Sequence, residues 1–254
     1  MDRWVDKVAV VTGASSGIGD AIARRLAKDG LKVAALARRA DRLQVLEQEV
    51  KESGARGIVK GYICDVTSES DLTSTFRSIE QDLGPIAVLI NNAGVLIKSN
   101  LTDLDLDGVK TLIDTNLHGV INCTKAGLAS MKAHNVDEGH IVNISSVTGN
   151  WSEPPPPASL YSASKHALNI FSVGLRAQLR NEKLGIRVST VSPGLVKTEM
   201  TEMFTGDISL GYYMLPEDIA DAVSYVIAAP HHVNVSQITV DTLFEVVYAR
   251  LGAM

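Results

Sequence analysis

The chain has 254 residues, of which 45% are hydrophobic and 21% charged, and its formal net charge is −5. This length suits one large α/β domain, and the balance of apolar and charged residues is typical of a folded protein rather than a disordered one. A negative net charge argues against a broad basic face, so we expect no nucleic-acid partner.

The cysteines and the first residues argue against disulfides, a cysteine-bound metal and secretion. Cys64 and Cys123 have neither CxxC nor Cys/His spacing, so the sequence indicates no disulfide framework and no metal site. Residues 1–6 carry charge where a signal peptide needs an apolar run, and no stretch approaches the ~18 apolar residues of a membrane span. We therefore expect a cytoplasmic protein without stable membrane insertion.

A glycine-rich loop lies between the first predicted strand and the first predicted helix. Residues 7–12 form a short β-branched run typical of a buried strand, and apolar residues recur at helical spacing after the loop as far as Gly30. Glycines in this context let the backbone approach a pyrophosphate, which the helix N-terminus attracts. The alternative is a tight turn without a ligand. The candidate dinucleotide-binding residues of the loop are Gly13, Ser15, Ser16, Gly17, Ile18 and Gly19.

Two arginines follow the second predicted strand, residues 32–37. A carboxylate in this region would bind the ribose 2′-hydroxyl of NAD, but Ala37 stands there instead. A guanidinium offers a planar, charged fork to the 2′-phosphate of NADP. We therefore predict NADP(H) as cofactor, with Arg38 as the first phosphate ligand and Arg39 as support; the alternative is two surface arginines at a loop.

Strands and helices continue to alternate along the chain. Further strands are predicted over residues 58–64, 86–90, 140–144, 187–191 and 235–240, and helices over 41–53, 72–83, 108–132, 161–179 and from 216 onward. This alternation predicts right-handed βαβ units. The expected fold is a single α/β domain over residues 1–254, a Rossmann fold with a doubly wound parallel sheet of about seven strands and helices on both faces.

Ligands of such a sheet bind at the carboxyl ends of its strands. Arg38, Asp65 and Asn91 are all predicted to lie at such ends. Asp65 is expected beneath an adenine; the less favoured alternative is that it orders the turn before a helix that Thr67 or Ser68 would cap.

Tyr161 and Lys165 stand four residues apart at the start of a long helical pattern, so they share one face of that helix. In a dry pocket the ammonium would favour the phenolate and lower the tyrosine pKa. Tyr161 could then act as an acid or base near neutral pH. The alternative is a tyrosine and a lysine on a solvated face.

Three further features of the sequence bear on this site. Asn116 lies inside a predicted helix, where a polar side chain is unfavourable unless something uses it. Residues 154–157 are four prolines, expected to form a stiff polyproline excursion just before Tyr161. Residues 198–215 mix methionines and aromatics with polar residues, which we interpret as a substrate lid or, alternatively, as a plain surface loop.

Taken in order, these motifs resemble the short-chain dehydrogenase/reductase family. The matching stretches are residues 12–19, Asn91-Asn92-Ala93-Gly94, Asn116, Ser146, Tyr161 with Lys165, and Pro193-Gly194 with Thr198. Residues 3–4, 37–39, 139–141 and 161–167 further resemble the insect NADP-dependent farnesol dehydrogenases and the related vertebrate 17β-hydroxysteroid dehydrogenases.

The resemblance implies a role for each matching residue. Tyr161 would exchange a proton with the substrate oxygen, Lys165 would hold the nicotinamide ribose, and Ser146 would orient the carbonyl. Asn116 would hold a water linked to Lys165, and Asn91 would secure the cofactor cleft. The candidate catalytic residues are thus Asn116, Ser146, Tyr161 and Lys165. The resemblance adds Asp65, Val66, Asn92, Ala93, Gly94, Tyr161, Lys165, Pro193, Gly194, Val196 and Thr198 to the cofactor-binding residues.

One departure affects the serine assignment. Tyr161 lies fifteen positions after Ser146, a longer interval than the family usually has, and the four prolines lie inside it. We interpret the extra residues as an insertion at the rim of the pocket. In another register Ser145 would take the serine role.

These observations predict an NADP(H)-dependent oxidoreductase acting on a small hydrophobic alcohol, aldehyde or ketone, such as farnesol or another isoprenoid. Apolar residues at Val147, Trp151, Leu160 and 200–215 support a hydrophobic substrate. The alternatives are a 17β-hydroxysteroid dehydrogenase, a broad carbonyl reductase, or a non-catalytic NADP-binding sensor or scaffold. By resemblance we expect a homodimer or homotetramer, although the small residues of the Tyr161 helix could pack equally on a second copy or on the chain's own sheet.

Overall fold

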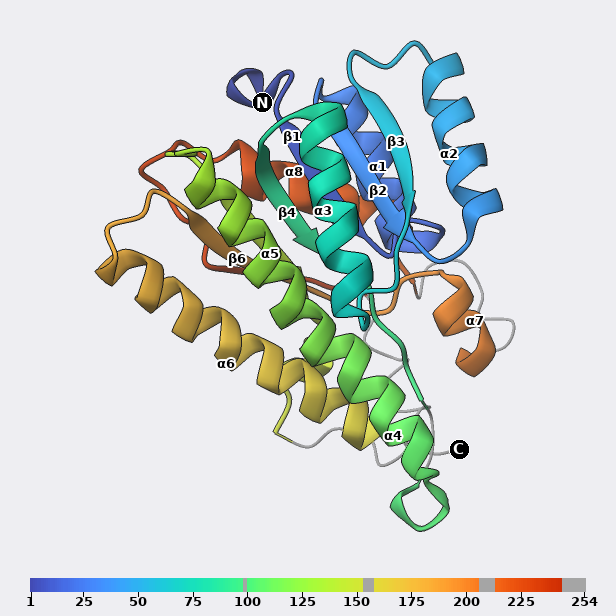
Figure 1. Cartoon of the computed structure of the whole chain (residues 1–254). Coiled ribbons are helices and arrows are strands. Elements are labelled where there is room, and N and C mark those ends of the chain that lie inside the picture. Colours follow the sequence, from blue (N-terminus) through green and yellow to red (C-terminus); the bar gives the residue numbers. More distant parts are fainter. Residues whose placement is uncertain (98–99, 153–157, 206–212, 244–254) are drawn as a thin grey trace.

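Seven parallel strands form one sheet in the computed structural model, which describes residues 1–97, 100–152, 158–205 and 213–243 (Figure 1). The strand order across the sheet is β3-β2-β1-β4-β5-β6-β7. The strands are β1 Val8–Thr12, β2 Lys32–Ala37, β3 Ile58–Ile63, β4 Ile86–Asn91, β5 His140–Ile144, β6 Arg187–Pro193 and β7 Gln237–Val240. The prediction of a parallel, doubly wound sheet is therefore confirmed.

Helices cover both faces of the sheet. They are α1 Gly17–Lys28, α2 Ala40–Glu52, α3 Glu69–Leu83, α4 Leu106–Ile113, α5 Gly119–Ala133, α6 Ser159–Asn181, α7 Glu199–Thr205 and α8 Pro216–Ala228. Short 3₁₀ turns lie at Asp2–Trp4, Leu101–Asp103 and Val147–Gly149. None of the described helices combines the length and the apolar character that crossing a membrane requires.

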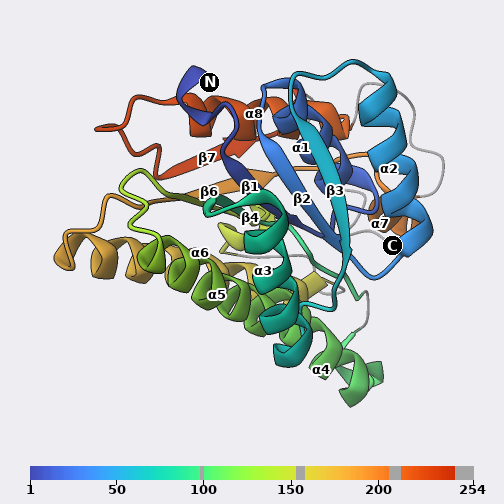
Figure 2. The same ribbon diagram turned by 45° about the horizontal axis from the view of Figure 1, so that its top comes forward.

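The two faces of the sheet bury separate parts of the core. One face packs against α1, α2 and α8, and the other packs against α3, α5 and α6 (Figure 2). Strands β1 and β4 are buried at every residue, because both of their faces are covered. The edge strand β3 is only partly buried. This explains why the inner strands are continuous apolar runs without alternation.

The helix predicted over residues 108–132 differs from the prediction in its middle. A π-helical turn, Asp114–His118, joins α4 to α5 and carries the buried Asn116. Such turns are rare and often lie at functional sites. The sequence predicted the length of this element but not the widened turn.

Ser68 caps α3, which decides between the two predicted caps. Its hydroxyl oxygen accepts a hydrogen bond from the backbone N–H of Asp71 at 3.2 Å. Thr67 instead donates from its N–H and its hydroxyl to the Asp65 carboxylate, at 2.9 and 2.7 Å. Asp65 therefore does order the turn after β3.

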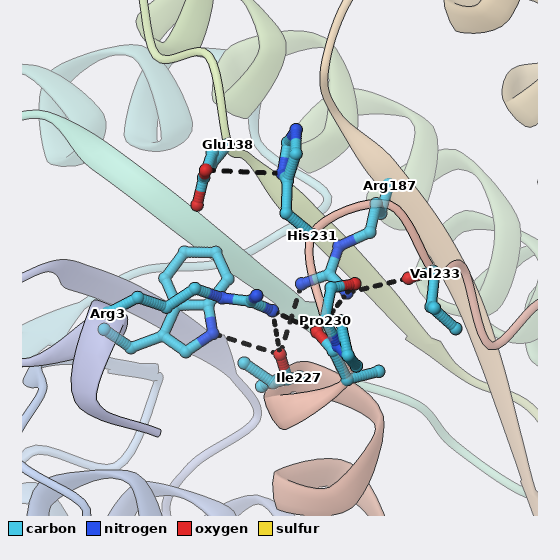
Figure 3. A network of polar contacts seen from close by, with 9 residues as sticks. Arg3, Glu138, Arg187, Ile227, Pro230, His231 and Val233 are labelled. Atoms are coloured by element: carbon cyan, nitrogen blue, oxygen red, sulfur yellow. Dashed lines mark hydrogen bonds and ion pairs between the residues drawn. The ribbon is translucent and has the colours of Figure 1, made fainter.

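Two arginines, which Figure 3 labels, and a tryptophan donate hydrogen bonds to the last carbonyls of α8. Arg3, Trp4 and Arg187 all donate to the Ile227 carbonyl, at 2.9, 3.0 and 3.1 Å. Arg187 also donates to Ala229 and Val233, at 3.0 Å each. The last carbonyls of a helix lack intrahelical partners, so cations are well placed there. The contacts fasten the start of the chain and β6 to the end of α8.

We predict that Arg187→Met destabilises the protein. The substitution keeps the aliphatic stem but leaves the Val233 carbonyl without this donor, and it removes two more charge-assisted bonds. Relief of repulsion from Arg3 offsets part of the loss, so we expect the free energy of unfolding to fall by about 1.5 to 3 kcal/mol. Urea denaturation measures it, with the exposed Arg180→Met as the matched control; equal stability of the two variants would contradict the assignment.

Candidate active site

A cavity of about 620 Å³ opens at the carboxyl ends of the strands. Residues that follow β1, β2, β3, β4, β5 and β6 contribute to its wall, together with the starts of α6 and α7. The sequence-predicted residues that line it are Gly13, Ser15, Ser16, Gly17, Ile18, Arg38, Arg39, Asp65, Val66, Asn92, Ala93, Gly94, Ser146, Tyr161, Lys165, Pro193, Gly194, Val196 and Thr198. The fold thus brings together segments that are far apart in the sequence.

Three predicted residues, Gly19, Asn91 and Asn116, support the wall of the cavity without lining it. A Cβ on Gly19 would collide with the Gly13 carbonyl and the Asn92 side chain, so this glycine lets α1 pack closely on the loop. Gly13 itself has φ +68°, and a Cβ there would lie 2.8 Å from the Ala93 Cα. The glycines bring the loop against the end of β4.

The ends of β1 and β4 are tied together at this point. The Thr12 hydroxyl oxygen accepts hydrogen bonds from the backbone N–H groups of Asn92 and Ala93, both at 3.0 Å. In return, the Asn92 amide donates to the Thr12 carbonyl at 2.9 Å. The two strands are neighbours in the sheet, at the point where the connections change from one face to the other.

Asn91 supports the cavity from inside the sheet. Its amide donates to Asn143 at 2.8 Å and to Thr124 at 3.0 Å, and Asn143 donates to Ser172 at 2.8 Å. All four side chains are buried. They link β4 and β5 to α5 and α6, so Asn91 fixes the elements around the cleft without lining it.

Asn116 holds the backbone that follows β4. Its amide donates to the Val95 carbonyl at 2.9 Å, and its oxygen accepts from the Val95 N–H at 2.8 Å. The same amide donates to the Ser164 hydroxyl at 3.2 Å, next to Lys165. These partners explain a polar residue inside a helix. The water that the resemblance places at Asn116 stays a prediction.

Tyr161 and Lys165 share one face of α6, as the spacing predicts. The Lys165 Nζ lies 5.6 Å from the centroid of the Tyr161 ring and donates to the Ile144 carbonyl at 2.9 Å. Burial lowers the Lys165 pKa to about 8. The ammonium form therefore predominates at neutral pH but is close to its titration range.

The Tyr161 pKa differs from the sequence-based expectation. Burial raises it to about 12, and a hydrogen bond with Ser146 acts in the opposite direction without cancelling the rise. The expected lowering by Lys165 is not observed in this structure, where the ammonium is directed to the Ile144 carbonyl. The phenol is thus protonated at neutral pH and can donate a proton.

The two serines after β5 point to different partners. Ser146 bonds with Tyr161 and accepts hydrogen bonds from the N–H and hydroxyl of Thr148, at 3.2 and 3.1 Å. The Ser145 hydroxyl instead lies 3.4 Å from the Lys165 carbonyl of α6. This geometry favours Ser146 for the serine role. The prolines of the inserted stretch lie outside the described residues.

Both predicted phosphate ligands are exposed, and Arg39 is the one held by hydrogen bonds. Arg39 donates to Ser15 at 3.0 and 3.1 Å and to Ser16 at 2.7 Å. Within the described chain no hydrogen bond holds the Arg38 guanidinium. Partial burial acts to raise the Asp65 pKa, but hydrogen bonds from Thr67 and the Arg38 charge bring it below its usual value.

The predicted lid is described at both of its ends. Residues 199–205 form α7, while 206–212 lie outside the described residues. The Lys197 N–H donates to the Met214 carbonyl at 2.8 Å, and the Met214 N–H donates to Leu195 at 2.9 Å. The two ends of the segment are therefore fastened to each other beside the cavity, where Met200 and Thr201 form part of the wall.

Several lining residues were not singled out from the sequence. They are Leu36, Cys64, Val95, Leu96, Thr115 and Ile144. Most lie at or just after a strand end, so the rule that ligands bind at carboxyl ends could have found them. Thr115 could not be found in this way, because it reaches the cavity from the π-helical turn.

The lining fits a nicotinamide dinucleotide. The glycine loop leaves room for a ligand where side chains would obstruct it. The arginines after β2 and Ser146 after β5 are separated by three inter-strand spacings, because β1 and β4 lie between these two strands. At about 4.8 Å per spacing this separation is roughly 14 Å, which suits an elongated ligand with an anionic end. Among the described residues, no group of three or more His, Cys, Asp or Glu side chains could hold a metal ion.

Comparison with known proteins agrees with this geometry. The family model for short chain dehydrogenases matches residues 7–208. Farnesol dehydrogenase of Aedes aegypti is 42% identical over 96% of this chain and 99% of its own length. Human dehydrogenase/reductase SDR family member 11 is 37% identical over 94% of this chain and 95% of its own.

Solved structures match the whole fold. An alcohol dehydrogenase from Thermococcus sibiricus, complexed with 5-hydroxy-NADP, has a TM-score of 0.84 and 28% identity, covering 94% of this chain and 97% of that one. A serine dehydrogenase complexed with NADP⁺ has a TM-score of 0.80 and 30% identity, covering 92% and 94%. The chain therefore belongs to the short-chain dehydrogenase/reductase family and is an oxidoreductase that uses a nicotinamide cofactor.

Proposed function

We propose that the protein is an NADP(H)-dependent dehydrogenase of a hydrophobic alcohol and reductase of the corresponding aldehyde or ketone, with an isoprenoid alcohol such as farnesol as substrate. The observation that carries the proposal is the meeting of Ser146, Tyr161 and Lys165 in one cavity with the glycine loop and Arg38. The 42% identity to a farnesol dehydrogenase supports the isoprenoid class.

The chain's own groups would hold the cofactor along the strand ends. The backbone of the glycine loop and the N-terminus of α1 would bind the pyrophosphate, and Arg38 and Arg39 the 2′-phosphate. Lys165 would bind the nicotinamide ribose. When bound, the nicotinamide supplies or accepts the hydride.

Tyr161 would move the proton at the substrate oxygen. With a pKa near 12 its phenol stays protonated, which suits proton donation during reduction of a carbonyl. In the direction of alcohol oxidation the phenolate must form, and a charged Lys165 would favour it. Ser146, which already bonds with Tyr161, would orient the same oxygen. Asn116 would act as a positioning residue through Val95 and Ser164.

Apolar side chains in the cavity support a hydrophobic substrate. Val95, Leu96 and Met200 line it. Of the other apolar residues that the sequence indicated, Val147 is buried, and Trp151 and Leu160 are half-buried without lining the cavity.

We further propose that the protein forms a homodimer or homotetramer through α6. Ile170 and Val173 are 73% and 55% exposed on this helix. Ala163, Gly174 and Ala177 are also exposed, so they face away from the chain's own sheet. An exposed apolar and small-residue face suits packing against a second copy.

The substrate proposal is tested by steady-state turnover. We expect farnesol with NADP⁺ to give a kcat/KM at least about tenfold above that of a 17β-hydroxysteroid or a short secondary alcohol, a difference that about 1.4 kcal/mol of pocket contacts supplies. Nucleotide absorbance at saturating cofactor measures it. A preference for the steroid or the short alcohol would overturn the isoprenoid assignment while leaving the family and mechanism intact.

Replacing Tyr161 tests the proton-transfer role. Tyr161→Phe keeps the ring but removes the hydroxyl, so kcat should fall by about 10²-fold or more while NADPH binding is retained. Tyr225→Phe is the control, because Tyr225 lies on α8 and is 64% exposed. Turnover of Tyr161→Phe close to that of the control would contradict the mechanism.

Charge reversal tests the cofactor assignment. Arg38→Asp replaces attraction of the 2′-phosphate by repulsion, so NADPH should bind about 10- to 100-fold more weakly and NADH nearly as before. Arg39→Asp should act in the same direction, and the exposed Arg77→Asp on α3 controls for net charge. Equal losses of NADPH and NADH affinity in the Arg38 variant would show that another residue recognises the phosphate.

A further inference from the structure

Glu199, the first residue of α7, lies against the proposed phosphate site. One of its carboxylate oxygens accepts a hydrogen bond from Arg39 Nη1 at 2.9 Å, and the carboxylate also bonds with Ser16. Its other oxygen is 3.9 Å from Arg42 Nη2. The contacts come from Arg39 of the β2–α2 connection, from Arg42 in the first turns of α2 and from a serine of the glycine loop.

The Arg39 guanidinium is engaged on every nitrogen. Nε and Nη2 donate to Ser15 and Ser16, and Nη1 donates to Glu199. The serine hydroxyls are neutral, so among the described residues Glu199 alone neutralises this cation. A carboxylate and a phosphate present the same kind of anionic oxygens to a guanidinium. The Glu199 carboxylate thus occupies the place beside Arg39 where an anionic ligand would bind.

We propose that Glu199 is an internal competitor of the cofactor's 2′-phosphate for Arg39, and so sets the affinity for NADP(H) and its preference over NAD(H). This rests on the proposed function, in which Arg38 and Arg39 receive the 2′-phosphate. Nη1 has a second N–H group, but a phosphate there would stand beside the carboxylate, and repulsion between the two anions favours displacement of Glu199. NAD(H) has a hydroxyl at this position and requires no displacement.

The competition also links the cofactor to the substrate side of the cavity. Met200 and Thr201 follow Glu199 directly and line the wall. Binding of the 2′-phosphate therefore releases the first residue of α7 from the β2–α2 connection. The same release does not accompany binding of NAD(H).

Glu199→Gln tests the proposal, because it keeps the shape of the side chain and removes its charge. Both members of the Glu199–Arg39 pair are about half exposed, so we expect NADPH to bind about three- to tenfold more tightly and NADH to change less than about twofold. Fluorescence titration of the reduced nucleotides at low ionic strength measures both dissociation constants. Glu202→Gln is the matched control, since Glu202 lies exposed on the same helix, and we expect it to change neither.

A second pair of variants separates competition at Arg39 from a general charge effect. In an Arg39→Met background, Glu199→Gln should no longer tighten NADPH binding. Three results would overturn the proposal. In these, Glu199→Gln leaves the NADPH affinity unchanged, raises the NADH affinity as much as the NADPH affinity, or raises the NADPH affinity fully even in the Arg39→Met background. These outcomes differ from failure of the proposed function, which would appear as an NADPH affinity that neither Arg38→Asp nor Arg39→Asp changes.

Discussion

The close approach of the glycine loop to the end of β4 is the constraint on which the site depends. Gly13 and Gly19 carry no side chain where one would strike Ala93 or Asn92, and Thr12 ties the two strand ends by paired hydrogen bonds. The cavity opens beside this contact because successive connections leave the sheet on opposite faces there. A side chain at either glycine would separate the strand ends and move every group that follows them.

The electrostatics of the site follow from what the fold buries. Lys165 is buried and directed to the Ile144 carbonyl, so its pKa falls to about 8, whereas that of the Tyr161 phenol rises to about 12. The arginines at the other side of the cavity stay exposed, and one of them is neutralised by Glu199. The cavity thus has a dry end suited to proton transfer and a solvated end suited to an anion.

Much of this arrangement could be predicted from residue patterns because buried parallel strands and amphipathic helices have distinct periodicities. All seven strands followed from local apolar runs, and the shared face of Tyr161 and Lys165 followed from helical spacing. The grouping of Ser146 with this pair followed from the family resemblance. Three features did not follow from the sequence: the π-helical turn at Asn116, the position of Gly19 behind the cavity wall, and the direction of the Tyr161 pKa shift. Each depends on three-dimensional contacts: which backbone an amide meets, how closely a helix packs, and where an ammonium points. The Glu199–Arg39 pair joins residues 160 positions apart, and no local pattern indicates it.

Hydrogen–deuterium exchange of the protein with and without NADPH tests the central claim most directly, namely that the strand ends form one dinucleotide site. The account predicts reduced exchange in the glycine loop and in the segments that follow β2, β4 and β6, with little change at the far ends of the same strands. Protection confined to other segments, or no protection at saturating NADPH, would contradict it.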